Sequence, residues 1–256
     1  MTLVERLDPT LDAVTVFRRL AHLSHALFLD SAARGGPTGR YSFVAADPIR
    51  WWDSATALAE IERFAGQLDE PARTDLPPFQ GGLAGMFGYE LSPQFERVPI
   101  ARIDEFQTPP LALGLYDVVY SFDHLQGAAW LISQDWSNVG AATRARFFFG
   151  ELASASGQID SVSAPLPTDS LAPQFPTGIE NLTSDFSAAA YLQTVRRAID
   201  YVHAGDVYQV NLSQRLLHPA IGSPIDLYLR LRERNPAPMA GYLDGGGWQV
   251  ASASPE

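Results

Sequence analysis

The chain has 256 residues, with 18 basic and 29 acidic side chains and no cysteine, and every basic residue is arginine. Without lysine or cysteine, this stretch cannot form a P-loop, a lysine Schiff base, a thiol nucleophile, a disulfide framework or a cysteine-ligated metal site. A formal net charge of -11 argues against the basic surface that nucleic acid or an anionic membrane requires. We therefore expect a small-molecule ligand or a protein partner, with no nucleic acid and no membrane.

Hydrophobic residues make up 46% of the chain, enough for one large core or two modest ones. No stretch approaches the roughly 18 to 20 consecutive apolar residues of a membrane span. The first residues, MTLVERLDPTLDAV, carry acidic side chains where a signal peptide has its basic and apolar regions. These features predict a cytoplasmic protein.

The first 153 residues predict helices and strands in alternation. Apolar residues at helical spacing predict a helix near residues 11–20, and strands are predicted at 26–30 and 40–46. Ser54 is the predicted N-cap of a second helix. Beyond it, residues 112–123 and 128–134 are β-rich runs on either side of a short hairpin loop, and a helix is predicted at 137–153.

Glycines recur every third residue at Gly82, Gly85 and Gly88, which invites comparison with a phosphate-binding loop. A dinucleotide fingerprint lies between a strand and a helix, whereas these glycines lie inside a strand-like run. A bulged or closely packed strand explains them better. His22 and His25 lie three residues apart, but two ligands do not make a metal site, and none is predicted within the chain.

Residues 154–178 have the composition of a linker, because 11 of these 25 residues are Ser, Pro or Gly. They divide an N-terminal region, 1–153, from a second region, 179–256. The second region predicts a helix that begins near Ser187 and ends at Gly205, a strand at 207–217, a helix at 224–234 and a closing hairpin. It ends on an uncovered strand, so we expect it to be truncated.

The strand predicted at 207–217 alternates between apolar and polar residues. Its polar side chains on one face are Gln209, Asn211, Ser213 and Arg215. Amides, a hydroxyl and a guanidinium suit a pocket for a small polar anion, because each forms directed hydrogen bonds. A solvent-facing strand is the alternative, and the pattern leaves both open.

Several segments, in a fixed order, together resemble the chorismate-utilising enzymes, and within them component I of aminodeoxychorismate synthase, the sister of anthranilate synthase component I. They are LDS at 29–31 with GRYSF at 39–43, QGGLAGMFGYE at 80–90, AGDVYQVNLSQR at 204–215, NPAP at 235–238 and SASPE at 252–256. The resemblance covers nearly the whole chain. It implies an α+β fold in which antiparallel sheets pack as a sandwich with helices outside, here incomplete at the C-terminus.

The resemblance also implies an activity: these enzymes combine chorismate with ammonia from a glutaminase subunit and use Mg²⁺. By its place in the SPE motif, Glu256 matches the catalytic glutamate, a general acid for loss of the ring hydroxyl. The family's magnesium-binding glutamates, its arginine for the substrate carboxylate and the lysine nucleophile of the aminodeoxychorismate branch match nothing here. We expect them beyond residue 256.

Many members of the family also hold L-tryptophan in the N-terminal sheet region. Carried over residue by residue, that pocket consists of Ser31, Thr38, Gly39, Arg40, Tyr41, Pro238, Met239 and Ala240. Asp30 replaces the more usual glutamate beside the serine, and Met239 and Ala240 replace an aromatic-Met pair. These smaller residues weaken the case for tight binding.

The function predicted from the sequence is that of aminodeoxychorismate synthase component I, on the route to 4-aminobenzoate and folate. One alternative is anthranilate synthase component I, which aminates another ring position and eliminates pyruvate. The other is a non-catalytic fragment that binds tryptophan or docks a partner. The isolated 256-residue chain is predicted to be inactive.

Overall fold

The computed structural model describes residues 1–36, 38–66, 68, 71–100, 103–154, 171–220 and 222–255. Their contacts define two compact units. Unit 1 comprises Met1–Ile100, Thr108–Ser163 and Gly222–Glu256, and unit 2 comprises Ala101–Gln107 and Ala164–Ile221. The division expected along the chain, 1–153, 154–178 and 179–256, therefore differs from the spatial one. Of the expected linker, residues 155–170 lie outside the described part of the chain.

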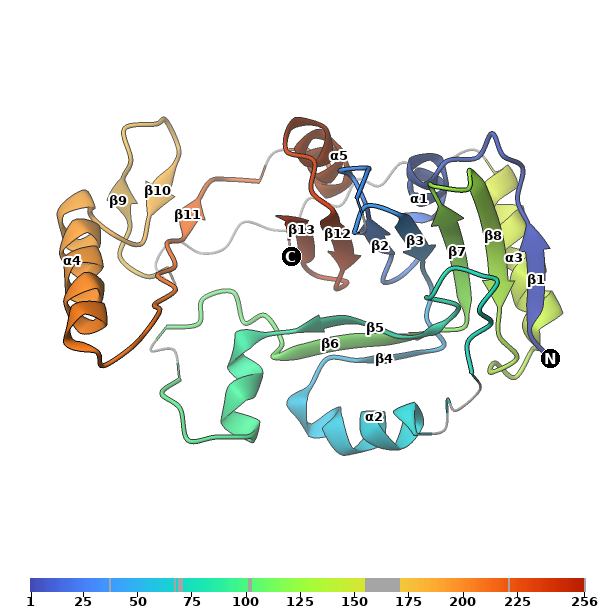
Figure 1. The fold of residues 1–256 in the computed structure, drawn as a ribbon, viewed down its shortest axis with the longest axis horizontal. Helices are drawn as coiled ribbons and strands as arrows, with labels where there is room; N and C mark the ends of the chain where they lie inside the picture. The colour runs from blue at the N-terminus through green and yellow to red at the C-terminus, as the bar shows by residue number, and fades with distance from the viewer. Residues whose placement is uncertain are drawn as a thin grey trace. The chain divides into compact units, whose positions relative to one another are not determined.

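Unit 1 is built on a seven-stranded antiparallel sheet with the strand order β1-β8-β7-β3-β2-β12-β13 (Figure 1). Its strands are β1 (Leu3–Arg6), β2 (Leu27–Asp30), β3 (Tyr41–Ala45), β7 (Val118–Asp123), β8 (Ala128–Ser133), β12 (Met239–Asp244) and β13 (Gln249–Ser254). Strand β12 pairs with β2, with Ala240 opposite Asp30. This pairing returns the end of the described chain to the N-terminal region, which composition along the chain could not reveal.

A second sheet of unit 1 has the order β4-β6-β5, formed by β4 (Arg50–Trp52), β6 (Leu111–Tyr116) and β5 (Gly82–Phe87). The apolar run predicted at 112–123 is therefore not one strand. It divides at Asp117, which is fully buried and bound by Arg144, and continues as β7 in the larger sheet. Leu27, Tyr116 and Leu243 belong to one cluster that lies between the sheets, so the two sheets pack face to face.

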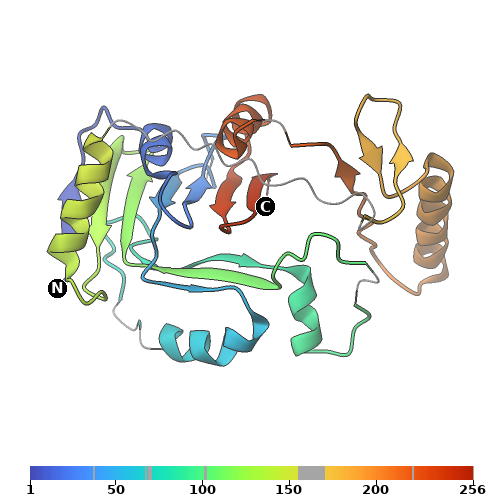
Figure 2. The same ribbon diagram turned by 180° about the vertical axis from the view of Figure 1, so that it is seen from behind.

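Helices cover the outer faces of both sheets in unit 1. On the larger sheet, α1 (Ala13–Leu20), α3 (Ala141–Ala153) and α5 (Pro224–Arg234) contribute Phe17, Phe148 and Tyr228 to the main core. The 3₁₀-helix η1 (Ala55–Ala57), capped by Ser54 as predicted, leads into α2 (Leu58–Ala65), which lies against the smaller sheet (Figure 2). The 3₁₀-helix η2 (Tyr89–Gln94) follows β5. The predicted α+β sandwich with outer helices is confirmed.

The glycine run forms strand β5, as the strand interpretation predicts. Gly85 has φ +152°, and a Cβ placed there would lie 2.1 Å from the carbonyl oxygen of Ala112 on β6. Only glycine allows the two backbones to approach this closely.

Unit 2 contains helix α4 (Ala188–Ala204) and three two-residue strands, β9 (Phe175–Pro176), β10 (Thr183–Ser184) and β11 (Leu216–Leu217). The helix begins after Ser187, whose hydroxyl accepts from the Ala190 N–H, and ends at Gly205 in a left-handed conformation, both as predicted. The strand predicted at 207–217 is wrong for 207–215: only Leu216 and Leu217 pair, with β10. Alternation alone does not make a strand without a neighbour to complete the hydrogen bonds. No described helix is long and apolar enough to cross a membrane.

Candidate functional site

The residues expected to hold tryptophan come together in unit 1. Strand β2 lies between β3 and β12, so the chain that leaves β2 is flanked by the segments that enter the other two strands (Figure 1). Ser31 follows β2, Tyr41 begins β3, and Pro238 immediately precedes β12. Three segments distant in sequence therefore meet at the same end of three neighbouring strands of the large sheet.

The Ser31 hydroxyl lies among three backbone carbonyl groups. Its Oγ is 2.6 Å from the oxygen of Tyr41, 3.3 Å from that of Thr38 and 3.4 Å from that of Pro238. One hydroxyl proton satisfies one acceptor, and the short contact assigns it to Tyr41. The carbonyls of Thr38 and Pro238 keep acceptor capacity beside this hydroxyl, and carbonyl and hydroxyl oxygens are the acceptors that a primary ammonium with three N–H donors needs.

The loop that carries Thr38 is held from both sides. Gly39 is buried, and a Cβ there would lie 2.5 Å from the carbonyl oxygen of Ala33, so no side chain fits. Arg40 forms an ion pair with Asp123 at the end of β7, with Nη2 2.7 Å from Oδ2. These contacts position the loop against the sheet before any ligand binds.

Asp123 is almost fully buried, which by itself raises the pKa of its carboxyl group. Hydrogen bonds from Arg40 and from the backbone N–H groups of Gln126 and Leu125 outweigh burial and lower that pKa below its ordinary value. The carboxylate therefore stays charged and keeps Arg40 in place.

Asp30, which replaces the family's glutamate, is buried and directed at helix α5. Its Oδ2 accepts from Arg232 Nε at 2.6 Å and from the Tyr228 hydroxyl at 3.0 Å. Burial, and then the charge of Asp30, raise the pKa of Tyr228, so the phenol remains a donor. Sequence reasoning missed Tyr228 and Arg232, because an aromatic and a basic residue four apart on a helix are typical of many surfaces.

The remaining expected residues lie at the start of β12. Ala240 is buried, Pro238 is partly buried, and Met239 is 47% exposed. The structure thus brings Ser31 into contact with Thr38, Tyr41 and Pro238, and the other four expected residues are sequence neighbours of these. Their role as a ligand site stays a prediction.

The four polar residues proposed for an anion pocket do not converge among the described residues. Gln209 and Asn211 are exposed and bonded to each other at 3.2 Å, and Ser213 is exposed. Arg215 is paired with the buried carboxylate of Glu105 and lies 5.2 Å from the ring of Phe106. The guanidinium therefore serves an internal contact in unit 2.

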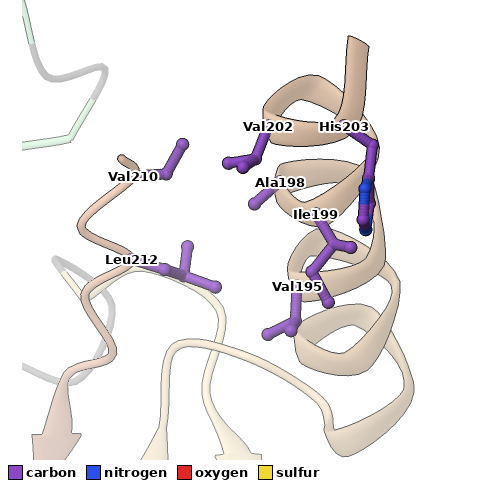
Figure 3. A pocket seen from close by; sticks show the side chains of 7 residues that line it. All are labelled: Val195, Ala198, Ile199, Val202, His203, Val210 and Leu212. Atoms are coloured by element: carbon purple, nitrogen blue, oxygen red, sulfur yellow. The ribbon is translucent and has the colours of Figure 1, made fainter. Parts of the chain in front are cut away.

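The apolar residues of the same segment line a cavity of about 270 Å³ against helix α4. Figure 3 shows Val210 and Leu212 on one side and the helix residues on the other. The helix contributes Val195, Ala198, Ile199, Val202 and His203. Six of its seven lining residues are apolar and none is arginine, so it offers little to a dicarboxylate ligand.

The expected catalytic acid, Glu256, lies outside the described residues. No group of three or more His, Asp or Glu side chains within the described part of the chain is arranged to hold a metal ion. The described residues therefore do not fit a Mg²⁺ site, and ligands beyond residue 256 stay a prediction.

A model of the chorismate binding enzyme family matches residues 24–256. The chain belongs to this family. Anthranilate synthase component 1 of Thermus thermophilus is 33% identical over 95% of this chain and 53% of its own length. Aminodeoxychorismate synthase component 1 of Escherichia coli is 28% identical over 94% of this chain and 52% of its own length. The chain thus spans about half the length of the curated relatives it matches.

Solved structures agree on the family fold. Anthranilate synthase component I from Streptococcus pneumoniae superposes with a TM-score of 0.63 at 22% identity, over 88% of this chain and 52% of that one. The isochorismate synthase MenF of Escherichia coli superposes with a TM-score of 0.51 at 13% identity, over 100% of this chain and 50% of that one. At these identities the likeness shows the fold alone.

Proposed function

We propose that this chain is part of an aminodeoxychorismate synthase component I, which aminates chorismate to 4-amino-4-deoxychorismate with ammonia from a glutaminase partner. The observation that carries the proposal is the family match over residues 24–256. The segments at 81–90 and 206–215 favour the aminodeoxychorismate branch, and the Escherichia coli relative of that name supports it.

In this proposal Glu256 is the general acid. Hydroxide is a poor leaving group, and a carboxylic acid that protonates the departing ring oxygen lowers the barrier to its loss. Mg²⁺, held by residues outside this chain, would bind a substrate carboxylate. The chain alone is expected to lack activity, because the lysine and the metal ligands of the branch match none of its residues.

The direct test is an assay with chorismate, ammonium and Mg²⁺, coupled to a lyase that releases 4-aminobenzoate. The product of the complete reading frame should form 4-aminobenzoate and not anthranilate, whereas the 256-residue chain should form neither above a Glu256→Gln control. Anthranilate as the main product contradicts the assignment. Turnover by the 256-residue chain well above that control contradicts only the expected inactivity.

The second candidate is anthranilate synthase component I. The Thermus thermophilus protein of that name, at 33% identity, favours it. The same assay separates the two, because the products differ in mass and in the position of the amino group. A lysine in the stretch that follows residue 256 would favour aminodeoxychorismate, and an alanine in its place anthranilate.

We further propose that L-tryptophan binds at Ser31, with its ammonium among the carbonyls of Thr38 and Pro238. The carbonyls of Thr38 and Pro238, which lie 3.3 and 3.4 Å from the Ser31 hydroxyl that is itself bonded to Tyr41, support this. Calorimetry should detect binding of tryptophan to the chain and none of indole-3-propionate, which has the same ring and carboxylate but no ammonium. The absence of heat at millimolar tryptophan would remove the assignment, together with the alternative of a non-catalytic tryptophan-binding module.

A further inference from the structure

A second hydroxyl, that of Ser42, holds the backbone of Ser31. Ser42, on β3, is fully buried, and its Oγ accepts a hydrogen bond from the backbone N–H of Ser31 at 3.1 Å. The same oxygen is 2.7 Å from Nε2 of His124 and 3.3 Å from Oδ1 of Asp30. His124 is half-buried and follows β7, where its own backbone N–H bonds to the carbonyl of Arg40.

The Ser42 hydroxyl has one proton and two candidate acceptors for it. Asp30 already accepts from the Tyr228 hydroxyl and from two nitrogens of Arg232. The contact to His124 is shorter by 0.6 Å, the difference between 3.3 and 2.7 Å. We assign the proton to the shorter contact, which requires the neutral His124 tautomer with its lone pair on Nε2, and the Ser42 Oγ accepts from the Ser31 N–H.

The surroundings of His124 favour that neutral form. Burial, and then the positive charge of Arg34 in the 31–40 loop, lower the pKa of the imidazole, and Arg232 on α5 acts in the same direction. Asp30 and Asp123 oppose them without reversing the shift. At neutral pH the ring is thus uncharged, and in the tautomer with its lone pair on Nε2 it accepts from Ser42. Protonation would turn the Ser42 hydroxyl away from it.

We infer that His124 is a positioning residue for the ammonium pocket: its Nε2 orients the Ser42 hydroxyl, which holds the Ser31 backbone N–H and so directs the Ser31 hydroxyl toward the carbonyls. The inference rests on the proposed tryptophan site for its ligand, although the chain of hydrogen bonds exists without one. His124 need not touch the ligand, because it acts through Ser42.

The test uses the 256-residue chain and three variants. His124→Ala removes the acceptor. His124→Gln supplies an uncharged amide that can still reach Ser42. The matched control is His22→Ala, whose imidazole pairs with Glu151 on α3 instead, at 2.9 Å. Hydrogen exchange of the Ser31 amide, followed by NMR, reports the positioning without any ligand, and calorimetry with tryptophan reports the pocket.

We expect His124→Ala to speed exchange of the Ser31 amide and to weaken tryptophan binding by about fivefold, the effect of one lost hydrogen bond. His124→Gln should restore both, and His22→Ala should change neither. As the pH falls from about 8 to about 5, tryptophan affinity should fall in the wild type, because imidazolium reverses the Ser42 bond and repels the ammonium. The His124→Gln profile should be flat.

Wild-type rates of Ser31 exchange in His124→Ala would overturn the inference, as would failure of glutamine to restore them. A wild-type chain that does not bind tryptophan, with Ser31 exchange still dependent on His124, would support the positioning role and overturn only the tryptophan assignment. Equal pH profiles for the wild type and His124→Gln would also count against the inference.

Discussion

Helix α1 of unit 1 buries Val16, Phe17 and Leu20 completely, whereas helix α4 of unit 2, more than twice as long, buries none of its 17 residues. Both helices have an N-cap side chain, Asp12 and Ser187, that accepts a backbone hydrogen bond. A cap stabilises a helix by about 1 kcal/mol, and burial of one large apolar side chain by about 1.5 to 3 kcal/mol. Local signals thus determine where a helix begins, and burial determines how strongly it is held.

The strands show the same difference. In unit 1 every long strand has a neighbour along its length, as β12 and β13 have in pairing six residues with six. In unit 2 the segment 207–215 alternates as a strand does, yet it packs Val210 and Leu212 against α4 without pairing. A hydrophobic pattern therefore selects a face, and strand formation also needs partner backbone groups.

The largest effect is expected for removal of a large core side chain. Phe17→Ala should lower the free energy of unfolding by about 3 to 5 kcal/mol, because it leaves a cavity among aromatic rings. The rings of Phe28, Tyr228 and Tyr242 lie 5.0 to 6.1 Å from that of Phe17. Ile199→Ala on α4, where the side chain is 49% exposed, should change the free energy of unfolding by less than about 1 kcal/mol. Urea unfolding followed by circular dichroism measures both changes. Equal losses of unfolding free energy would contradict the expected difference between the two units.

A smaller difference is expected between two glycines. Gly85→Ala in β5 forces a methyl group against the carbonyl of Ala112 and should cost about 2 to 3 kcal/mol. Gly205→Ala after α4 meets no atom within 4 Å and should cost only about 1 kcal/mol, the strain of its φ of +81°. The same unfolding experiment compares them. A larger cost at Gly205 would show that the end of α4 is more tightly packed than the structure indicates.

The smallest effect concerns the pH dependence of unit 1. Because the pKa of Asp123 is lowered in the folded state, its contribution to stability is complete above the ordinary aspartate value of about 4 and is lost as the pH falls through the folded pKa. One such group changes the free energy of unfolding by at most about 1.4 kcal/mol per pH unit. Asp123→Asn should be less stable than the wild type at pH 7, with the gap closing in acid. A gap independent of pH would contradict the assignment.

The sequence pointed to the residues around Ser31 but not to those that hold Ser31 from the sheet and from α5. Ser31 and Pro238 belong to motifs, and the resemblance named them before their proximity was visible. Ser42 lies in the GRYSF motif but was given no role, and His124 and Tyr228 had no such signal, because a histidine in a hairpin loop and a tyrosine on a helix are ordinary residues there. Strand pairing and the packing of α5 on the sheet brought them together.

Sequence alone determined the features that depend on near neighbours: the caps at Ser54 and Ser187, the left-handed end at Gly205 and the hairpin of β12 and β13. Each rests on hydrogen bonds or backbone conformations within a few residues. Tertiary structure alone decided that β12 pairs with β2, that the run at 112–123 divides between two sheets, and that 207–215 forms no strand. These outcomes depend on partners far along the chain, which no local pattern specifies.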